Sequence, residues 1–210
     1  MSTPVARLID ASRFHDSRLV LKKINFDLFP GEITIILGEN GAGKSTLLRL
    51  LAGMLALDSG KRVVAEGTTI GFIGHGTFVY PDLTAAENLK FWARASGIAN
   101  PDIAAILEHL GLAGRENDKP RSFSRGMLQR LAHGSLLLAN PLLILLDEPF
   151  TGLDESFKAV MKEDLDRMRA NGAAIALVSH DREDRELGDK ICRIANKKLT
   201  FEPGRRKAFQ

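Results

Sequence analysis

Unbroken apolar runs and alternating apolar and polar residues divide much of the chain into short strand-like segments. The clearest is Leu142–Leu146, an apolar run that is typical of a strand buried on both faces of a parallel sheet. Glu32–Leu37 has the same character and follows the turn sequence Phe29-Pro30-Gly31. Further strands are predicted at 5–10, 19–28, 173–178, 191–195 and 199–201, the last two as edge strands.

Helical patterns lie between these strands. They predict helices from Lys44 to about residue 55, at 102–110 and at 154–169. Thr84 begins a capping box, and Ser124 is expected to cap a helix that runs to about Ala139. Because strands alternate with helices, the sequence predicts an α/β fold with a parallel core, which a mainly helical block interrupts.

Composition limits the class of protein. Its 210 residues suit one domain, and 44% apolar with 26% charged residues excludes a mostly disordered or collagen-like chain. The net charge of +3 does not predict a nucleic-acid partner. One cysteine, Cys192, excludes an internal disulfide and fits a reducing compartment. No apolar stretch approaches the length of a membrane span and no signal-peptide pattern is present, so we expect a cytosolic location. The basic segment 205–207 is interpreted as a solvated tail, with contact to anionic lipid as the alternative.

A glycine-rich segment follows the predicted strand Glu32–Leu37. Residues 38–45 read GENGAGKS and fit the pattern G-x-x-x-x-G-K-[ST] between a strand and a helix. Glycines let backbone N–H groups approach a phosphate, and the start of a helix adds a favourable dipole. Lys44 would then reach the terminal phosphates and the Ser45 hydroxyl would ligate Mg²⁺. The alternative is a glycine turn without a ligand.

Two acidic residues, Asp147 and Glu148, end the apolar run Leu142–Leu146. The carboxyl ends of strands are where open α/β sheets bind ligands. Asp147 is expected to hold Mg²⁺, through water, and Glu148 to act as the general base for the attacking water. His180 follows another predicted strand and is a candidate contact for the γ-phosphate. The alternatives are helix caps for the acidic pair and a structural role for the histidine.

Together these motifs resemble the nucleotide-binding subunit of ABC transporters, above all in LLILLDEPFTGLD at 142–154. The resemblance implies a P-loop NTPase fold with a mainly parallel core sheet, an antiparallel β subdomain and an inserted helical subdomain at about 80–138, in a single domain at 1–210. It implies ATP hydrolysis with Mg²⁺, a catalytic switch at His180 and an aromatic that stacks on adenine at Phe14, for which a core phenylalanine is the alternative. The nucleotide-binding residues that it implies are Phe14, Gly38, Glu39, Asn40, Gly41, Ala42, Gly43, Lys44, Ser45, Thr46, Ser124, Arg125 and Gly126.

The family's signature sequence, LSGGQ, reads FSRGM at 123–127 in this chain. In the family this segment caps the γ-phosphate of the nucleotide on the other subunit. The resemblance therefore implies a head-to-tail dimer with a second copy or with a paralogous ATPase subunit. Arg125 replaces the first glycine and would bring a cation near the phosphates, whereas capping of a helix by Ser124 alone is the alternative.

A second departure falls at His75, where the family has a glutamine that contacts Mg²⁺. Imidazole suits this hard ion less well than an oxygen ligand, so we expect contact through water. Facing the membrane partner is the alternative for His75. Phe91 and Trp92 are candidate anchors for a helix of an integral membrane subunit, with burial in the core as the alternative.

The subfamily is indicated by Gly74-His75, by TAAENLKF at 84–91 and by the SRGM and DEPFTGLD segments. In these the chain is similar to the heme-exporter ATP-binding subunit of the cytochrome c maturation system. The resemblance implies a peripheral location on the inner face of the cell membrane and no nucleic-acid partner. Another small-molecule or multidrug exporter, a non-transport ABC ATPase and a regulator that binds ATP without turnover remain alternatives.

Overall fold

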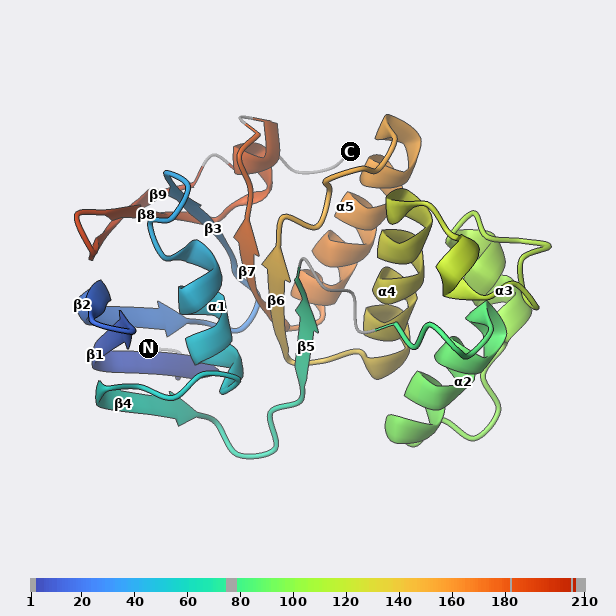
Figure 1. The fold of residues 1–210 in the computed structure, drawn as a ribbon, viewed down its shortest axis with the longest axis horizontal. Helices are drawn as coiled ribbons and strands as arrows, with labels where there is room; N and C mark the ends of the chain where they lie inside the picture. The colour runs from blue at the N-terminus through green and yellow to red at the C-terminus, as the bar shows by residue number, and fades with distance from the viewer. Residues whose placement is uncertain (1–2, 75–78, 182, 205, 207–210) are drawn as a thin grey trace. The chain divides into compact units, whose positions relative to one another are not determined.

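The computed structural model describes residues 3–74, 79–181, 183–204 and 206. Figure 1 shows two sheets and a group of helices. The strands are β1 Ala6–His15, β2 Arg18–Leu28, β3 Ile33–Gly38, β4 Ser59–Val64, β5 Ile70–Ile73, β6 Leu143–Asp147, β7 Ala174–Val178, β8 Lys190–Ala195 and β9 Lys198–Pro203. The helices are α1 Lys44–Ala52, α2 Ala85–Ala95, α3 Ile103–His109, α4 Arg125–Ala139 and α5 Glu155–Ala170, with short 3₁₀ turns η1 Pro120–Ser122 and η2 Glu183–Leu187.

The described residues fall into two compact units. One comprises Met1–Gly74, Pro141–Pro149 and Asp166–Gln210, and it holds both sheets with α1. The other comprises His75–Asn140 and Phe150–Leu165, and it holds α2, α3, α4 and most of α5. We refer to them as the sheet unit and the helical unit.

The larger sheet of the sheet unit has the strand order β5-β6-β7-β3-β8-β9 in the described residues. Its strands pair in parallel except for β8 with β9, which are antiparallel. Every residue of β6 and of β7 is buried, as the apolar runs predict. This order brings the carboxyl ends of β6, β7 and β3 to one edge of the sheet, where α/β folds place their ligands.

The smaller sheet is antiparallel, in the order β2-β1-β4. Helix α1 contacts β1 as well as β3, β6 and β7, so one apolar core joins both sheets. Leu47, Leu48, Leu50 and Leu51 of α1 are fully buried in it. Burial on several faces explains why this short helix carries so many leucines.

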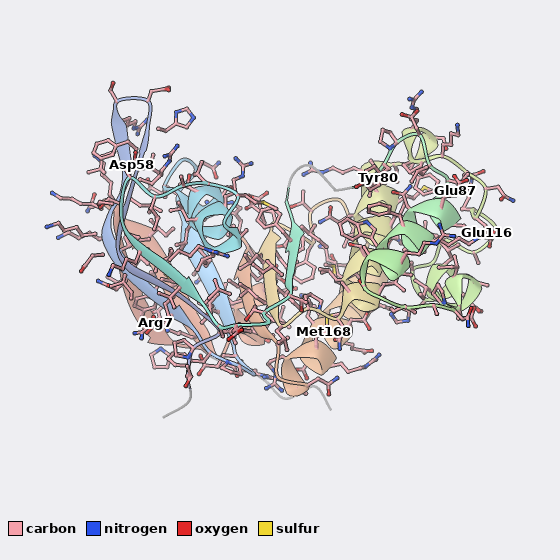
Figure 2. All side chains as sticks on the ribbon, turned by 90° about the horizontal axis from the view of Figure 1, so that it is seen from below. Arg7, Asp58, Tyr80, Glu87, Glu116 and Met168 are labelled. Atoms are coloured by element: carbon pink, nitrogen blue, oxygen red, sulfur yellow. The ribbon has the colours of Figure 1, made fainter. Side chains whose placement is uncertain are left out.

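Buried polar side chains fix the helical unit. Asn88 on α2 is 2% exposed, and its amide bonds the backbone of Tyr80, Leu83 and Thr84, which shapes the loop before the helix. Thr84 forms the predicted capping box with Glu87 (labelled in Figure 2), and Ser124 accepts a hydrogen bond from the backbone N–H of Met127 as the predicted N-cap of α4.

A carboxylate of the helical unit is shared by two histidines. Asp164 on α5 accepts hydrogen bonds from Nε2 of His109 on α3 and of His133 on α4, each at 2.8 Å. Burial raises the pKa of Asp164, but these hydrogen bonds outweigh it, so the pKa lies below its usual value and the carboxylate is ionised. Neither histidine has metal-ligand spacing in the sequence, and sequence reasoning gave them no role.

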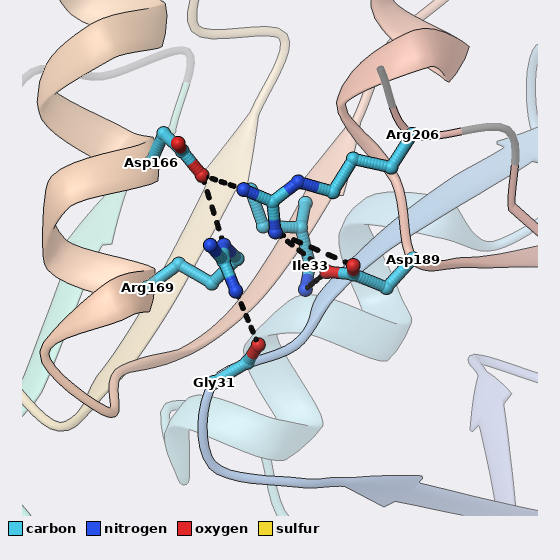
Figure 3. A network of polar contacts seen from close by, with 6 residues as sticks. All are labelled: Gly31, Ile33, Asp166, Arg169, Asp189 and Arg206. Carbon is cyan, nitrogen blue, oxygen red and sulfur yellow. Dashed lines mark hydrogen bonds and ion pairs between the residues drawn. The ribbon is translucent and has the colours of Figure 1, made fainter. Parts of the chain in front are cut away.

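Arg206 lies in a polar network at the amino end of β3 (Figure 3). It donates to Asp166 and, at 3.3 Å, to Asp189, whose other oxygen accepts from the N–H of Ile33 at 2.9 Å. Arg169 bonds Asp166 and the carbonyl of Gly31. The interpretation of Arg206 as part of a solvated tail is therefore wrong, because carboxylates from two other segments hold its guanidinium.

The predicted fold class is confirmed: the chain is α/β with a mainly parallel sheet, an antiparallel sheet and a set of helices. Three details differ. Strands β4 and β5 were not predicted, α1 ends at Ala52 because Gly53 adopts a left-handed cap, and β8 is an inner strand between β3 and β9.

In the part of the chain that the structure describes, no helix combines the length and apolarity that crossing a bilayer requires.

Candidate functional site

The glycine-rich loop connects β3 to α1, as predicted. Gly41 and Gly43 have φ of 78° and 106°, conformations that glycine adopts without strain. Gly38 is needed for space, because an added Cβ would lie 2.9 Å from the carbonyl oxygen of Ile194 on β8. The N-cap of α1 is Gly43, which offers no side-chain cap, and the first turn carries no acidic residue. The start of this helix therefore presents backbone N–H groups to an anion, which is what a phosphate requires.

Lys44 lies within this loop and is 7% exposed. Its ammonium donates to the carbonyl oxygens of Gly38 at 2.8 Å and of Glu39 at 3.0 Å. Burial lowers the pKa of Lys44 below its usual value, although the carboxylates of Glu148 and Asp147 act in the opposite direction. The three charged groups thus lie within electrostatic reach of one another.

Two strand ends supply the acidic residues and the histidine. Asp147 ends β6 and is 3% exposed. The next residue, Glu148, has φ of 56°, and its N–H bonds the carbonyl of Val178 on β7 at 3.1 Å. That turn of the chain aims its side chain at His180, whose Nε2 lies 2.9 Å from Oε1 of Glu148. A left-handed backbone at a glutamate is strained, and such strain clusters at functional sites.

A further buried pair supports the segment before His180. Ser179 donates to the carboxylate of Asp184, and its hydroxyl accepts from the N–H of Asp181 at 3.1 Å. Ser179 and Asp184 are both buried. This pair fixes the backbone on both sides of His180, and sequence reasoning missed it because Asp184 belongs to no recognised motif.

The oxygen atoms near the loop suit Mg²⁺. Ser45 and Asp147 offer a hydroxyl and a carboxylate, the hard oxygen donors that this ion prefers. In the described ranges no group of three or more His, Cys, Asp or Glu residues forms a complete metal site. A small donor set fits Mg²⁺, which usually keeps several waters and takes further ligands from substrate phosphates. His75 lies outside the described residues.

The signature segment lies in the helical unit, where Gly126 packs against Gly152. An added Cβ at Gly126 would lie 2.6 Å from the carbonyl oxygen of Gly152, so only glycine permits this approach. The aliphatic carbons of the Arg125 side chain lie beside Gly152. Arg130 forms an ion pair with Asp154, and hydrogen bonds from Ser156, Phe157 and Arg130 lower the pKa of that carboxyl. The segments 124–126 and 152–154 are therefore held together.

The remaining predicted residues lie near the loop or on the surface. Phe14, near the end of β1, is 41% exposed. Glu39 and Asn40 are exposed, whereas Ala42 and Thr46 are half-buried. Phe91 is 40% exposed and Trp92 half-buried, so burial of both in the core, the alternative interpretation, is wrong.

Sequence reasoning missed Tyr80, whose ring lies beside the exposed Phe91. Its ring lies 4.7 Å from that of Phe91 and is 43% exposed, and Phe91 lies 5.4 Å from Trp92. We call Tyr80, Phe91 and Trp92 the aromatic surface. The hydrogen bonds of Asn88 to Tyr80 hold it in place, but an asparagine within a helix gives no such signal in the sequence.

A glycine loop between a buried parallel strand and a helix, with a carboxylate at the end of a strand two places along the sheet, defines the P-loop NTPase class. Within that class, the family model described as "ABC transporter" matches residues 21–151. The chain belongs to the ABC transporter family, and it is an ATPase domain of that family.

Curated relatives include the linearmycin resistance ATP-binding protein LnrL of Bacillus subtilis, 33% identical over 84% of this chain and 62% of that protein. The maltose/maltodextrin import ATP-binding protein MalK of Escherichia coli K12 is 34% identical over 82% of this chain and 51% of that protein. The chain thus spans only about half to three fifths of the length of these relatives.

Solved structures give the same fold. The superposition on the structure of an ATP-binding subunit of an ABC transporter has a TM-score of 0.85 at 25% sequence identity. It covers 95% of this chain and 90% of that subunit. The ATP-binding cassette MJ0796, solved as a dimer in a post-hydrolysis state with ADP and Pi, has a TM-score of 0.84 at 22% identity. That comparison covers 97% of this chain and all of the other, and it supports the fold alone.

Proposed function

We propose that this chain is the ATP-hydrolysing motor subunit of a membrane transporter. In this proposal residues 1–210 form a single nucleotide-binding domain, and a helical subdomain at about 80–138 is inserted within a RecA-like core. The observation that carries the proposal is the 2.9 Å contact between Glu148 and His180, at the sheet edge that also carries Lys44 and Asp147. A domain that only binds nucleotide would not need this pair.

The residues of the sheet unit divide the chemistry among themselves. The loop N–H groups and Lys44 bind the phosphates of ATP, and a phosphate oxygen replaces the carbonyls of Gly38 and Glu39 as partners of the ammonium. Ser45 and Asp147 would hold Mg²⁺, with water between the ion and His75. When bound, this ion neutralises charge on the transferred phosphoryl group.

Glu148 accepts a proton from the attacking water as general base. His180 donates to Glu148 in this structure and would contact the γ-phosphate when ATP is bound. The hydrogen bonds around Ser179 keep the histidine backbone in place, so its imidazole can turn between these two partners without movement of the chain.

A second copy, or a paralogous subunit, would complete the site head to tail. Ser124, Arg125 and Gly126 would then contact the nucleotide held by the partner. Arg125 would contribute a guanidinium, which pairs with phosphate oxygens more strongly than a backbone N–H does. The proposal of a dimer rests on the resemblance of residues 124–126 to the family's signature segment, and the MJ0796 cassette, which shares the fold over its whole length and was solved as a dimer, is compatible with it.

The aromatic surface is the candidate docking site for an integral membrane subunit. Exposed aromatic side chains supply large apolar contact areas, and Tyr80 and Phe91 are held in contact with each other before any partner binds. The relatives named for maltose import and for linearmycin resistance support a transport role. The chain would then act at the cytoplasmic face of the cell membrane.

Heme is the proposed cargo, on the strength of the segments at 74–75, 84–91, 124–127 and 147–154. Export of another small molecule is the second candidate, because the relative LnrL is named as a linearmycin resistance ATP-binding protein. A subunit of this kind need not touch cargo, so its partners identify what is moved.

The test uses Glu148→Gln, with Glu202→Gln as the matched control on the exposed edge strand β9. Glu148→Gln should retain ATP binding, lose hydrolysis by at least about a hundredfold, and accumulate as a dimer with ATP and Mg²⁺. The control should behave as the wild type. Full turnover by Glu148→Gln would refute the assignment of the base, and a variant that stays monomeric with bound ATP would refute the dimer.

The partners are then captured with tagged Glu148→Gln from solubilised membranes of the host, with ATP present. Polytopic subunits together with heme-handling proteins would support heme export. Another permease would retain the motor and exclude heme, whereas capture of no membrane protein, together with ATP turnover by the wild type alone, would favour a non-transport ATPase.

A further inference from the structure

We propose that Asp58 is the positioning residue for Phe14, and so determines how strongly the site holds a nucleotide base rather than a bare triphosphate. The inference rests on the proposed function and on the sequence-based prediction that the Phe14 ring stacks on the base of the nucleotide. Its first observation is a hydrogen bond from the backbone N–H of Phe14 to Oδ2 of Asp58, at 2.8 Å across 44 positions of sequence.

Strand β1 is irregular in the residues that precede Phe14. Its register with β2 shifts between Ala11 and Arg13 and again between Arg13 and Phe14. Its register with β4 shifts between Ile9 and Ser12. Bulges of this kind re-aim a side chain and leave backbone groups without a ladder partner. The carboxylate of Asp58 provides the partner that the ladder does not, so it selects the direction in which the Phe14 ring points.

The segment that carries Asp58 is fixed against the same strand. The N–H of Asp58 donates to the carbonyl of Ser12 at 3.0 Å, and the buried Ser12 hydroxyl accepts from the N–H of Lys23 at 3.0 Å. Gly60 has φ of 90°, and an added Cβ would lie 2.5 Å from the carbonyl oxygens of Ile9 and Asp10. The chain thus passes close against β1 just after Asp58, so the carboxylate has little freedom to move. Figure 2 shows Asp58 beside the β1–β2 hairpin.

The exposure of the ring makes this backbone contact important. Phe14 is 41% exposed, so packing restrains it less than it restrains a core aromatic. Arg13 also reaches Oδ2 of Asp58, at 3.2 Å, but both side chains are partly exposed and such ion pairs contribute little. The contact that matters is therefore the hydrogen bond to the Phe14 backbone, and Arg13→Ala should leave binding nearly unchanged.

Calorimetric titration with Mg-ATP and with Mg-tripolyphosphate separates base from phosphate contacts. Asp58→Ala should weaken ATP binding by roughly tenfold, the scale of one base–aromatic stacking contact, and leave tripolyphosphate binding unchanged. Phe14→Ala should give the same loss, and the double variant no further loss. Asp58→Asn keeps an oxygen that accepts the Phe14 N–H, so it should restore most of the affinity.

Asp27→Ala is the matched control, because Asp27 pairs with Arg7 at 2.9 Å at one end of the β1–β2 ladder, whereas Phe14 pairs with Leu19 at the other end. Thermal melting of each variant verifies that it folds. Unchanged ATP affinity in Asp58→Ala, or an equal loss for tripolyphosphate, would overturn the inference. A loss of ATP affinity in Asp58→Ala but not in Phe14→Ala would also overturn the inference. It would leave the proposed binding of ATP by the glycine-rich loop unaffected. Wild-type protein that binds neither probe would instead refute the proposed function.

Discussion

Replacement of Asp164 should show that a buried carboxylate holds three helical segments together. The side chain of Asp164 is 1% exposed, and His133, which donates to it, is completely buried. His109, the second donor, is 38% exposed. In Asp164→Ala, the His109 N–H can turn to water, whereas the His133 N–H has no such access. The variant therefore loses a buried acceptor and leaves a buried donor without its bond.

The size of the effect follows from these exposures. A hydrogen bond to a charged group contributes about 1.5–3 kcal/mol, and the His109 bond lies at the lower end because water competes for it. Breaking a buried charge-assisted network by removing one partner costs about 3–5 kcal/mol, which we expect for Asp164→Ala. Both histidines donate to the same oxygen, Oδ2, and the amide oxygen of Asp164→Asn can take its place without the negative charge, so the loss in this variant should be about 1–3 kcal/mol.

Urea unfolding at pH 7 measures these free energies, with Asp166→Ala as the control on the same helix. Asp166 is 23% exposed and its two partners, Arg169 and Arg206, keep some access to water, so its loss should be about 1–2 kcal/mol, smaller than that of Asp164→Ala. Because the folded pKa of Asp164 is lowered, its contribution is complete above the usual carboxyl range and disappears as pH falls below about 4. The difference in free energy of unfolding between the wild type and Asp164→Ala should therefore shrink in acid. An Asp164→Ala loss no larger than that of Asp166→Ala would refute the reasoning.

Three further predictions test single positions. Gly43→Ala should destabilise the protein by about 1–3 kcal/mol and abolish ATP binding, because φ is 106° and the new Cβ would lie 3.0 Å from Val20; melting and titration measure both, and normal binding would contradict the loop geometry. Gly126→Ala should lower kcat with little change in KM for ATP, since the new Cβ would lie 2.6 Å from the carbonyl oxygen of Gly152 and push that carbonyl away; unaltered steady-state kinetics would contradict this prediction. Cys192 is buried and its pKa is raised to about 12 by burial, so iodoacetamide at pH 8 should label it only in urea; rapid labelling of native protein would show that it is accessible.

The central strands were predictable because burial on both faces leaves a continuous apolar run in the sequence. β6 and β7 have this pattern, and Leu142–Leu146 alone predicts the strand that Asp147 ends. β4 reads SGKRVV and is largely exposed, and β5 has only four residues, so neither presents a period that identifies a strand. Their pairing with β1 and β6 is a tertiary effect.

The candidate site likewise has residues that a local sequence pattern predicts and residues that only the tertiary structure brings together. The phosphate loop is contiguous, and each of its residue types has a local reason, so residues 38–45 were predictable from sequence. Asp58 and Phe14 lie 44 positions apart, and Asp164 lies 55 from His109 and 31 from His133. Such contacts depend on bulges and helix packing that no local pattern encodes. A surface aspartate in a turn and two isolated histidines therefore carry no signal.

The positive φ of Glu148 has a consequence for directed evolution. A non-glycine residue in that conformation costs about 1 kcal/mol or more, and glycine removes this backbone strain, although its greater freedom in the unfolded chain offsets part of the gain. The proposed base thus occupies a position where the replacement that relieves the strain also removes the carboxylate. A screen that selects only for heat resistance should enrich Glu148→Gly, so libraries built on this chain must select for turnover and for thermal tolerance together.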